Sequence, residues 1–144
     1  MSITFTLAAL KTRLTTDPAN IGYAADVAAR HDQQLETLAN DKTTGGTVAR
    51  EPIASSEFLL TISADIDRMT SLQKQDLYSG WLAGGTVPIA DQRFQDWWAR
   101  VATESFTSTV AVKALQTRPA SDMEVAFGAG RFVGVNEISQ ALNL

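Results

Sequence analysis

The stretch from 91 to 103 constrains the fold of this chain more than any other part of it. Its large apolar side chains, Phe94, Trp97, Trp98 and Val101, follow one another at i, i+3, i+4 and i+7. This spacing places them on one face of an α-helix and leaves polar side chains on the others. The stretch therefore predicts an amphipathic helix whose aromatic face is a core contact.

A second helix is expected just before it. Thr70 and Gln73 have the spacing of a capping box, in which the hydroxyl accepts from the N3 amide and the Gln side chain accepts from the cap amide. The helix that follows carries one apolar face and ends at Gly84-Gly85. With one residue from a later helix, these two segments supply the predicted core residues: Phe94, Trp97, Trp98, Val101, Leu77, Trp81, Leu82 and Leu115.

The segments near the two ends also have helical patterns. The first apolar stripe steps by four, three and four residues and ends near Thr15-Thr16; it consists of Ile3, Leu7, Leu10 and Leu14. Asp17-Pro18 offers an N-cap and a proline at the first helical position, which predicts a short helix ending at Gly22. Thr107 or Ser108 can cap a helix that ends before Pro119. Near the C-terminus, Ser121 and Glu124 repeat the capping-box pattern, and 135–142 closes the chain as a last helix.

These patterns predict a single all-α domain. A length of 144 residues matches the commonest domain size. We expect one compact domain over 1–144 with about six to eight short and medium helices, and at most a minor β excursion near Thr47-Arg50. The expected layout is N-terminal helices in 1–40, a loop in 41–53, a central helical bundle in 54–118 and a C-terminal helical hairpin in 119–144.

The composition argues against several classes of protein. Hydrophobic residues make up 44% of the chain, which excludes a disordered chain of low hydrophobicity. The net charge is −4 and the basic residues are scattered singly, so no tract is suited to phosphate backbones. Without cysteine, and with His31 as the only histidine, the chain offers neither a zinc site nor a catalytic triad. No apolar run approaches the 18 residues of a membrane span, so we expect no membrane association.

No motif predicts an enzyme. Asp65-Ile66-Asp67 begins like a calcium loop, but Met69 stands where a third oxygen ligand belongs, and Thr70 where the loop requires glycine. We therefore interpret both carboxylates as solvated. Gly128-Ala129-Gly130 lacks the spacing of a nucleotide-binding fingerprint. The sequence thus predicts no catalytic, cofactor-binding or metal-binding residue.

Three segments allow a second interpretation. The C-terminal hairpin could present the last helix to a DNA groove as a helix-turn-helix, although its only basic neighbour is Arg131. The aromatic residues of the central segment could line a ligand pocket instead of a core. Near the start, Ile3, Phe5 and Leu7 could form a docking arm for another subunit rather than an internal helix face.

A series of short landmarks runs along nearly the whole chain: Ala8-Ala9-Leu10-Lys11, Thr16-Asp17-Pro18, Gly22-Tyr23-Ala24, Leu38-Ala39-Asn40, Ala83-Gly84-Gly85-Thr86-Val87, Arg118-Pro119-Ala120-Ser121 and Phe127-Gly128-Ala129-Gly130. In this order they resemble a family of small proteins encoded by tailed bacteriophages and prophages. The chain departs from that pattern at Ala25-Asp26, where relatives carry a small residue followed by a Ser/Thr-Asp cap.

The resemblance implies a structural protein of the virion, not an enzyme. The expected role is a neck or head-to-tail connector subunit, or alternatively a tail-associated or capsid accessory (decoration) subunit. Its expected partners are other virion proteins and further copies of itself in a ring or repeated assembly, formed in the host cytoplasm. It implies no cofactor and no direct DNA contact. An alternative of another class is a DNA-associated regulatory protein that uses the C-terminal hairpin.

The aromatic stripe yields a first prediction. Replacing a buried large aromatic residue by alanine costs about 3 to 5 kcal/mol, which is comparable to much of a small domain's stability. We expect Trp97→Ala or Trp98→Ala, whichever side chain is more central, to give an unfolded or insoluble chain in a urea titration or solubility assay. Full stability of both variants would place the stripe against solvent or a partner.

Overall fold

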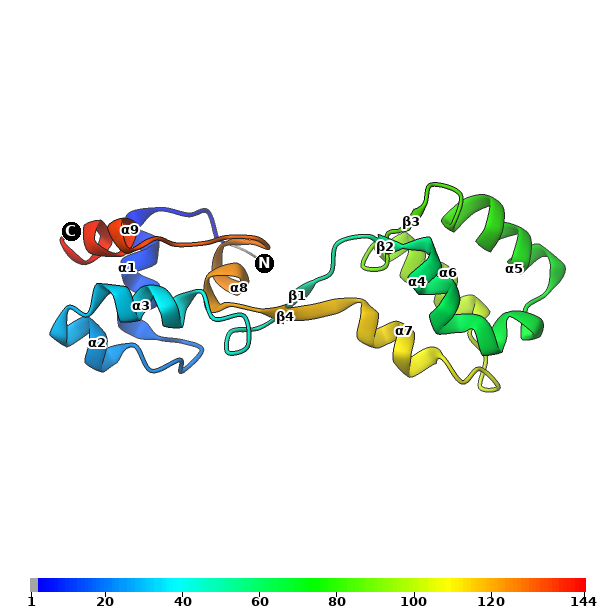
Figure 1. Cartoon of the computed structure of the whole chain (residues 1–144), viewed down its shortest axis with the longest axis horizontal. Helices are drawn as coiled ribbons and strands as arrows, with labels where there is room; N and C mark the ends of the chain where they lie inside the picture. The colour runs from blue at the N-terminus through cyan, green and yellow to red at the C-terminus, as the bar shows by residue number, and fades with distance from the viewer. Residues whose placement is uncertain (1–2) are drawn as a thin grey trace. The chain divides into compact units, whose positions relative to one another are not determined.

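A computed structural model describes residues 3–144, and in it the protein is mostly helical, with 56% of its residues in helices (Figure 1). The expectation of a helical fold is confirmed, but the fold is not strictly all-α, because four short strands pair into two sheets. β1 (Gly46–Ala49) pairs with β4 (Thr117–Ala120), and β2 (Ile53–Ala54) pairs antiparallel with β3 (Thr86–Val87). The expected excursion near Thr47-Arg50 coincides with β1. Nine α-helices lie within the described residues, more than the six to eight expected.

The chain divides into two compact units. Unit 1 joins Met1–Val48 to Pro119–Leu144, and unit 2 is the intervening Ala49–Arg118. The segments expected to form separate N-terminal and C-terminal parts, 1–40 and 119–144, thus belong to one unit. The expected single domain over 1–144 stays a prediction.

Unit 1 is built from helices at both ends of the chain. They are α1 (Leu7–Thr16), α2 (Ala24–Ala29), α3 (Asp32–Ala39), α8 (Asp122–Phe127) and α9 (Val135–Leu142). The last helix, α9, packs against α1 and α3 (Figure 1). The apolar core cluster of this unit comes from α1, α3, α8 and α9 and from two residues that precede helices, Tyr23 and Val133. Its buried members are Leu10, Leu14, Tyr23, Leu35, Ala39, Met123, Val133, Ile138 and Ala141.

Two details of unit 1 differ from the sequence prediction. The first helix begins at Leu7 rather than near Ile3, because the hydroxyl of Thr6 accepts from the N–H of Ala9 and caps the helix there. The short helix expected after Asp17-Pro18 does not form. Instead, Asp17 ends α1 in the left-handed conformation, and its carboxylate accepts hydrogen bonds from the backbone N–H groups of Ile21, Gly22 and Tyr23. The aspartate therefore organises a loop instead of starting a helix.

Unit 2 contains the remaining helices. They are α4 (Ser55–Ile62), the 3-10 helix η1 (Ser63–Arg68), α5 (Ser71–Gln75), the π-helix η2 (Asp76–Trp81), α6 (Gln92–Val101) and α7 (Thr109–Leu115). The helix expected after Thr70 thus changes from α to π geometry, with the N–H of Leu82 bonded to the carbonyl of Leu77 at 2.9 Å. The two predicted capping boxes, Thr70 with Gln73 and Ser121 with Glu124, are confirmed.

The predicted core residues lie in the aromatic core of unit 2. Leu77, Leu82, Phe94, Trp97, Trp98 and Val101 are buried, while Trp81 and Leu115 are partly buried and pack against them. The rings meet largely edge to face, as aromatic quadrupoles favour: Phe58 with Phe94 and Trp98, and Trp81 with Phe94.

A close backbone approach in unit 1 gives a second prediction. A Cβ at Gly45 would lie 2.2 Å from the backbone N of Asp122 and the backbone C of Ser121. Since backbone atoms cannot turn aside as a side chain can, we expect Gly45→Ala to lower the free energy of unfolding by about 3 kcal/mol in a urea titration. Gly84→Ala is the matched control, because a Cβ there meets no atom within 4 Å. Equal stability of the two variants would contradict this packing.

Candidate functional site

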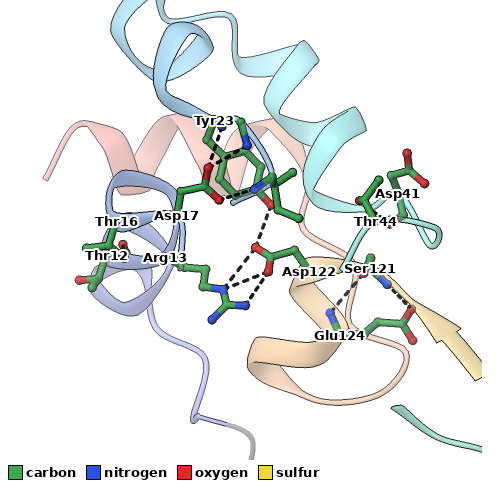
Figure 2. Close-up of polar contacts among 12 residues, drawn as sticks. Thr12, Arg13, Thr16, Asp17, Tyr23, Asp41, Thr44, Ser121, Asp122 and Glu124 are labelled. Atoms are coloured by element: carbon green, nitrogen blue, oxygen red, sulfur yellow. Dashed lines mark hydrogen bonds and ion pairs between the residues drawn. The ribbon is translucent and has the colours of Figure 1, made fainter. Parts of the chain in front are cut away.

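The most extensive polar network in unit 1 surrounds Asp122, at the start of α8 (Figure 2). This aspartate is fully buried. Arg13 of α1 donates from Nε to both carboxylate oxygens at 3.2 Å and also from Nη2. The hydroxyl of Tyr23, just before α2, donates to Oδ2 at 2.8 Å. One carboxylate thus joins α8 to two neighbouring segments that lie 109 and 99 residues earlier in the sequence.

The pKa shifts in this network fit a structural role, in which the hydrogen bonds hold the segments together. Burial raises the pKa of Tyr23, and the negative charge of Asp122 raises it further, so the hydroxyl remains a protonated donor. The hydrogen bond to Asp122 raises the pKa of Arg13 in the same way. Each partner of the carboxylate therefore keeps its proton near neutral pH, whereas a general base would need a partner that gives one up.

In unit 2, Asp65 is the corresponding buried carboxylate that accepts several hydrogen bonds. It is fully buried, so its interpretation as a solvated carboxylate is wrong. It accepts from the backbone N–H groups of Thr107 at 3.0 Å and Ser108 at 2.8 Å, from both of their hydroxyls, and from Arg68 at 2.8 Å. Ser108 is the N-cap residue of α7, as one of the two predicted positions, but its hydroxyl donates to Asp65 and makes no cap bond to the helix. The carboxylate thus satisfies the N–H groups of the two residues that precede α7. In the described residues, no group of carboxylates and histidine could hold a metal ion.

The expected surface histidine lies at the start of α3. The side chain of His31 is 64% exposed, and its Nδ1 lies 3.1 Å from Asp26. It borders an open polar depression of about 770 Å³ with Asp26, Arg30 and Asp32. Arg30 pairs with Asp32 at 3.3 Å, so these surface charges largely bind one another.

The candidate docking arm divides between surface and core. Ile3 is 57% exposed, although its N–H bonds to the carbonyl of Ala126. Phe5 and Leu7 pack on the core of unit 1, and the ring of Phe5 meets that of Phe127 edge to face. Only Ile3 is therefore left free for a neighbouring subunit, and that role stays a prediction.

The C-terminal pair offers little cationic surface. The guanidinium of Arg131 lies 3.6 Å from the centroid of the Phe5 ring and donates to Glu137 at 3.1 Å. Its charge is thus engaged within unit 1, which gives the DNA-binding alternative no support from this residue.

A depression beside the π-helix of unit 2 is the candidate binding site. It measures about 510 Å³ and is lined by Gln75, Asp76, Ser79, Gly80, Trp81 and Trp97. The indole N–H of Trp97 donates to Oδ2 of Asp76 at 3.4 Å. The centroids of the Trp81 and Trp97 rings lie 5.9 Å apart, with their planes inclined by 48°. The depression therefore combines two aromatic surfaces with one carboxylate.

Sequence reasoning assigned both tryptophans to the core, with a ligand pocket lined by the aromatic residues as the alternative, and did not single out Asp76. The π turn brings Asp76, Gly80 and Trp81 into one lining. Its six residues are too few for periodicity to distinguish π from α geometry. The one signal in the sequence is Gly80, a glycine inside a helical pattern.

A second depression lies between α6 and α7. It measures about 490 Å³, and its lining includes Trp98, Gln95, Lys113 and Gln116. The indole N–H of Trp98 is buried and has no acceptor among the described residues. The indole N–H of Trp97, by contrast, has an acceptor in Asp76.

Comparison of the chain with protein-family models, with curated proteins and with solved structures finds no match in any of the three. Among residues 3–144, no helix is both long and apolar enough to cross a membrane.

The buried carboxylate of unit 2 predicts a specific pH dependence. Burial alone would raise the pKa of Asp65, but the hydrogen bonds from Ser108 and Thr107 outweigh it and lower the pKa to about 2. Because an unfolded aspartate titrates near pH 3.9, this group stabilises the fold above about pH 4, and that contribution is lost as the pH falls towards 2.

We expect urea midpoints measured from pH 7 to pH 2 to fall less steeply below pH 4 for Asp65→Asn than for the wild type. Asp67→Asn, which changes an exposed aspartate two residues away, should follow the wild-type curve. Parallel curves for the wild type and Asp65→Asn would show that the carboxylate is not held as described.

Proposed function

We propose that this protein is a structural subunit of a tailed-phage virion that acts through protein–protein contacts, as part of the neck that connects head to tail. The resemblance carried by the landmarks from Ala8-Ala9-Leu10-Lys11 to Phe127-Gly128-Ala129-Gly130 supports this proposal. Tail-associated and capsid accessory positions are alternatives of the same kind, since they require the same property of being bound by neighbours.

The observation that carries the proposal is the contrast between the interior and the surface. The buried carboxylates, Asp65 and Asp122, have their hydrogen bonds taken up inside the protein. Large apolar side chains remain outside, with Leu60, Leu72 and Val110 exposed by 78%, 74% and 82%. At protein interfaces, exposed apolar side chains are covered by the partner and become buried in the contact. A chain with this distribution is suited to be held by other proteins.

In a repeated assembly, contacts of this kind would be enough to hold the subunits together. Rings and shells use one interface many times, so a modest individual contact can still give a stable particle. Only 19% of the residues are charged, which lowers the cost of removing the surface from water. Both features are consistent with a ring subunit.

The proposal predicts that the protein is a component of purified particles. Mass spectrometry of particles purified after induction of the encoding phage should detect it in a fixed ratio to other virion proteins, and an image of a labelled particle should place the label at the neck. Detection in the lysate of infected cells but not in purified particles would reject a virion role. A label at the capsid or tail would favour the corresponding alternative.

Surface variants test whether the exposed apolar side chains contact neighbouring proteins. α4 and α7 pack together, and each exposes one large apolar side chain, Leu60 and Val110. We expect the double variant Leu60→Lys, Val110→Lys to keep the wild-type melting temperature and to enter particles poorly. Ala114→Lys, at an exposed position of α7, is the control and should be incorporated normally. Normal incorporation of the double variant would remove these side chains from the interface.

A further inference from the structure

Gly80 occupies a position where the fold itself does not need glycine. It lies inside η2, its backbone is outside the left-handed region, and a Cβ there would meet no atom within 4 Å. Glycine in a helix interior is destabilising relative to alanine because it loses more backbone freedom on folding. Since Gly80 belongs to the lining of the depression, the space that it leaves open lies on the outside of the helix.

The π geometry of η2 points to the same place. Single π turns inside helices are uncommon and occur frequently at functional sites. Here the turn is closed by the bond from the N–H of Leu82 to the carbonyl of Leu77, and Asp76, Gly80 and Trp81 of this element share one lining. The costly turn and the costly glycine therefore coincide at one depression.

The two tryptophans of the lining are fixed from the protein side. Phe94, which is fully buried, lies with its ring centroid 5.2 Å from that of Trp81 and 5.9 Å from that of Trp97. Trp97 is 7% exposed, and its N–H is directed to Asp76. Rings held in this way are pre-organised, so a ligand would not have to bear the entropy of ordering them.

The charge of the lining selects the ligand class. Asp76 is its only ionisable residue, and its Oδ1 has no hydrogen bond among the described residues. Aromatic faces attract cations through the ring quadrupole, and tryptophan does so most strongly. A guanidinium group is planar and weakly hydrated, so it can stack on an indole while donating to a carboxylate.

We propose that this depression binds the guanidinium group of an arginine side chain carried by a partner protein. Asp76 accepts its N–H groups, the partly exposed ring of Trp81 contacts its plane, the buried Trp97 holds Asp76 in place through its indole N–H, and Gly80 leaves room for the approaching chain. This inference goes beyond the virion assignment and does not require the partner to be a virion protein.

The full-length protein can be titrated with N-acetyl-arginine amide while the three indole N–H resonances are followed by NMR. We expect saturable shifts of the Trp81 and Trp97 resonances at ligand concentrations of about 1 to 50 mM, as for a single exposed cation–π and carboxylate contact. Trp98 does not line this depression and is the internal reference. N-acetyl-citrulline amide is the neutral isostere and should give no saturable shift.

Titrations with other cationic compounds test whether the depression prefers a guanidinium group to other cations. Weaker binding of N-acetyl-lysine amide and tetramethylammonium than of the arginine compound supports the guanidinium assignment. Tighter binding of tetramethylammonium would overturn it in favour of a small free cation. Equal shifts from the arginine and citrulline compounds, or none from either, would overturn the site itself. Neither result depends on whether the protein is found in particles.

Variants connect the shifts to the lining. Asp76→Asn should weaken binding about 2- to 5-fold, the usual size of an exposed charge contact. Gly80→Leu should abolish it by filling the depression. Gly80→Ala should raise the folding equilibrium constant about 4-fold and keep the fold available for titration, with weakened binding. Asp96→Asn is the control, because it removes a carboxylate from the depression between α6 and α7. If it weakened binding as much as Asp76→Asn, the proposal would be contradicted.

Discussion

A carboxylate that leaves water must be met by hydrogen-bond donors, and this requirement governs how each unit is put together. Asp122 draws its donors from Arg13 and Tyr23, which lie 109 and 99 residues away in the sequence. Asp65 draws two of its donors from backbone amides 42 and 43 residues away. Burying a charge costs several kcal/mol unless its partners are in place. These contacts therefore determine which segments can meet, even where their net contribution to stability is small.

Polar contacts also position the segments whose apolar side chains pack in each unit. In unit 1, Asn40 exchanges two hydrogen bonds with the backbone of Val133, and Glu36 accepts from the N–H of Val135. These bonds fix the start of α9, whose buried face can then pack on α1 and α3. In unit 2, the capping of the amides before α7 by Asp65 accompanies the aromatic core formed around Phe94. Directional polar contacts set the register, and non-directional burial supplies most of the stabilisation.

Local features were the predictable part of this structure. The stripe in 91–103, the closing helix 135–142 and both capping boxes depend on residues within a few positions of one another, and the structure contains them. Of the strands, only β1 was anticipated, as the excursion near Thr47-Arg50; its pairing with β4 could not be read in this way, because β4 includes Pro119 and lies about seventy residues later. The burial of Asp65 likewise depends on amides more than forty residues away. The loop around Asp17 is local, but Asp17-Pro18 fits a helix start as well as a helix end, and the sequence prediction chose the start. The candidate site was anticipated only as an aromatic pocket, because its carboxylate, Asp76, meets Trp97 from a position 21 residues away.

The protonation of the buried groups bears on what kind of function this fold can serve. General acid–base catalysis needs a group whose pKa lies near the working pH. The environments described here do the reverse: the pKa of Asp65 is lowered to about 2, and burial beside a carboxylate raises that of Tyr23. Both groups keep one protonation state throughout the neutral range, so their charge and hydrogen bonds are constant. Each group therefore acts as a fixed hydrogen-bond partner within its own unit.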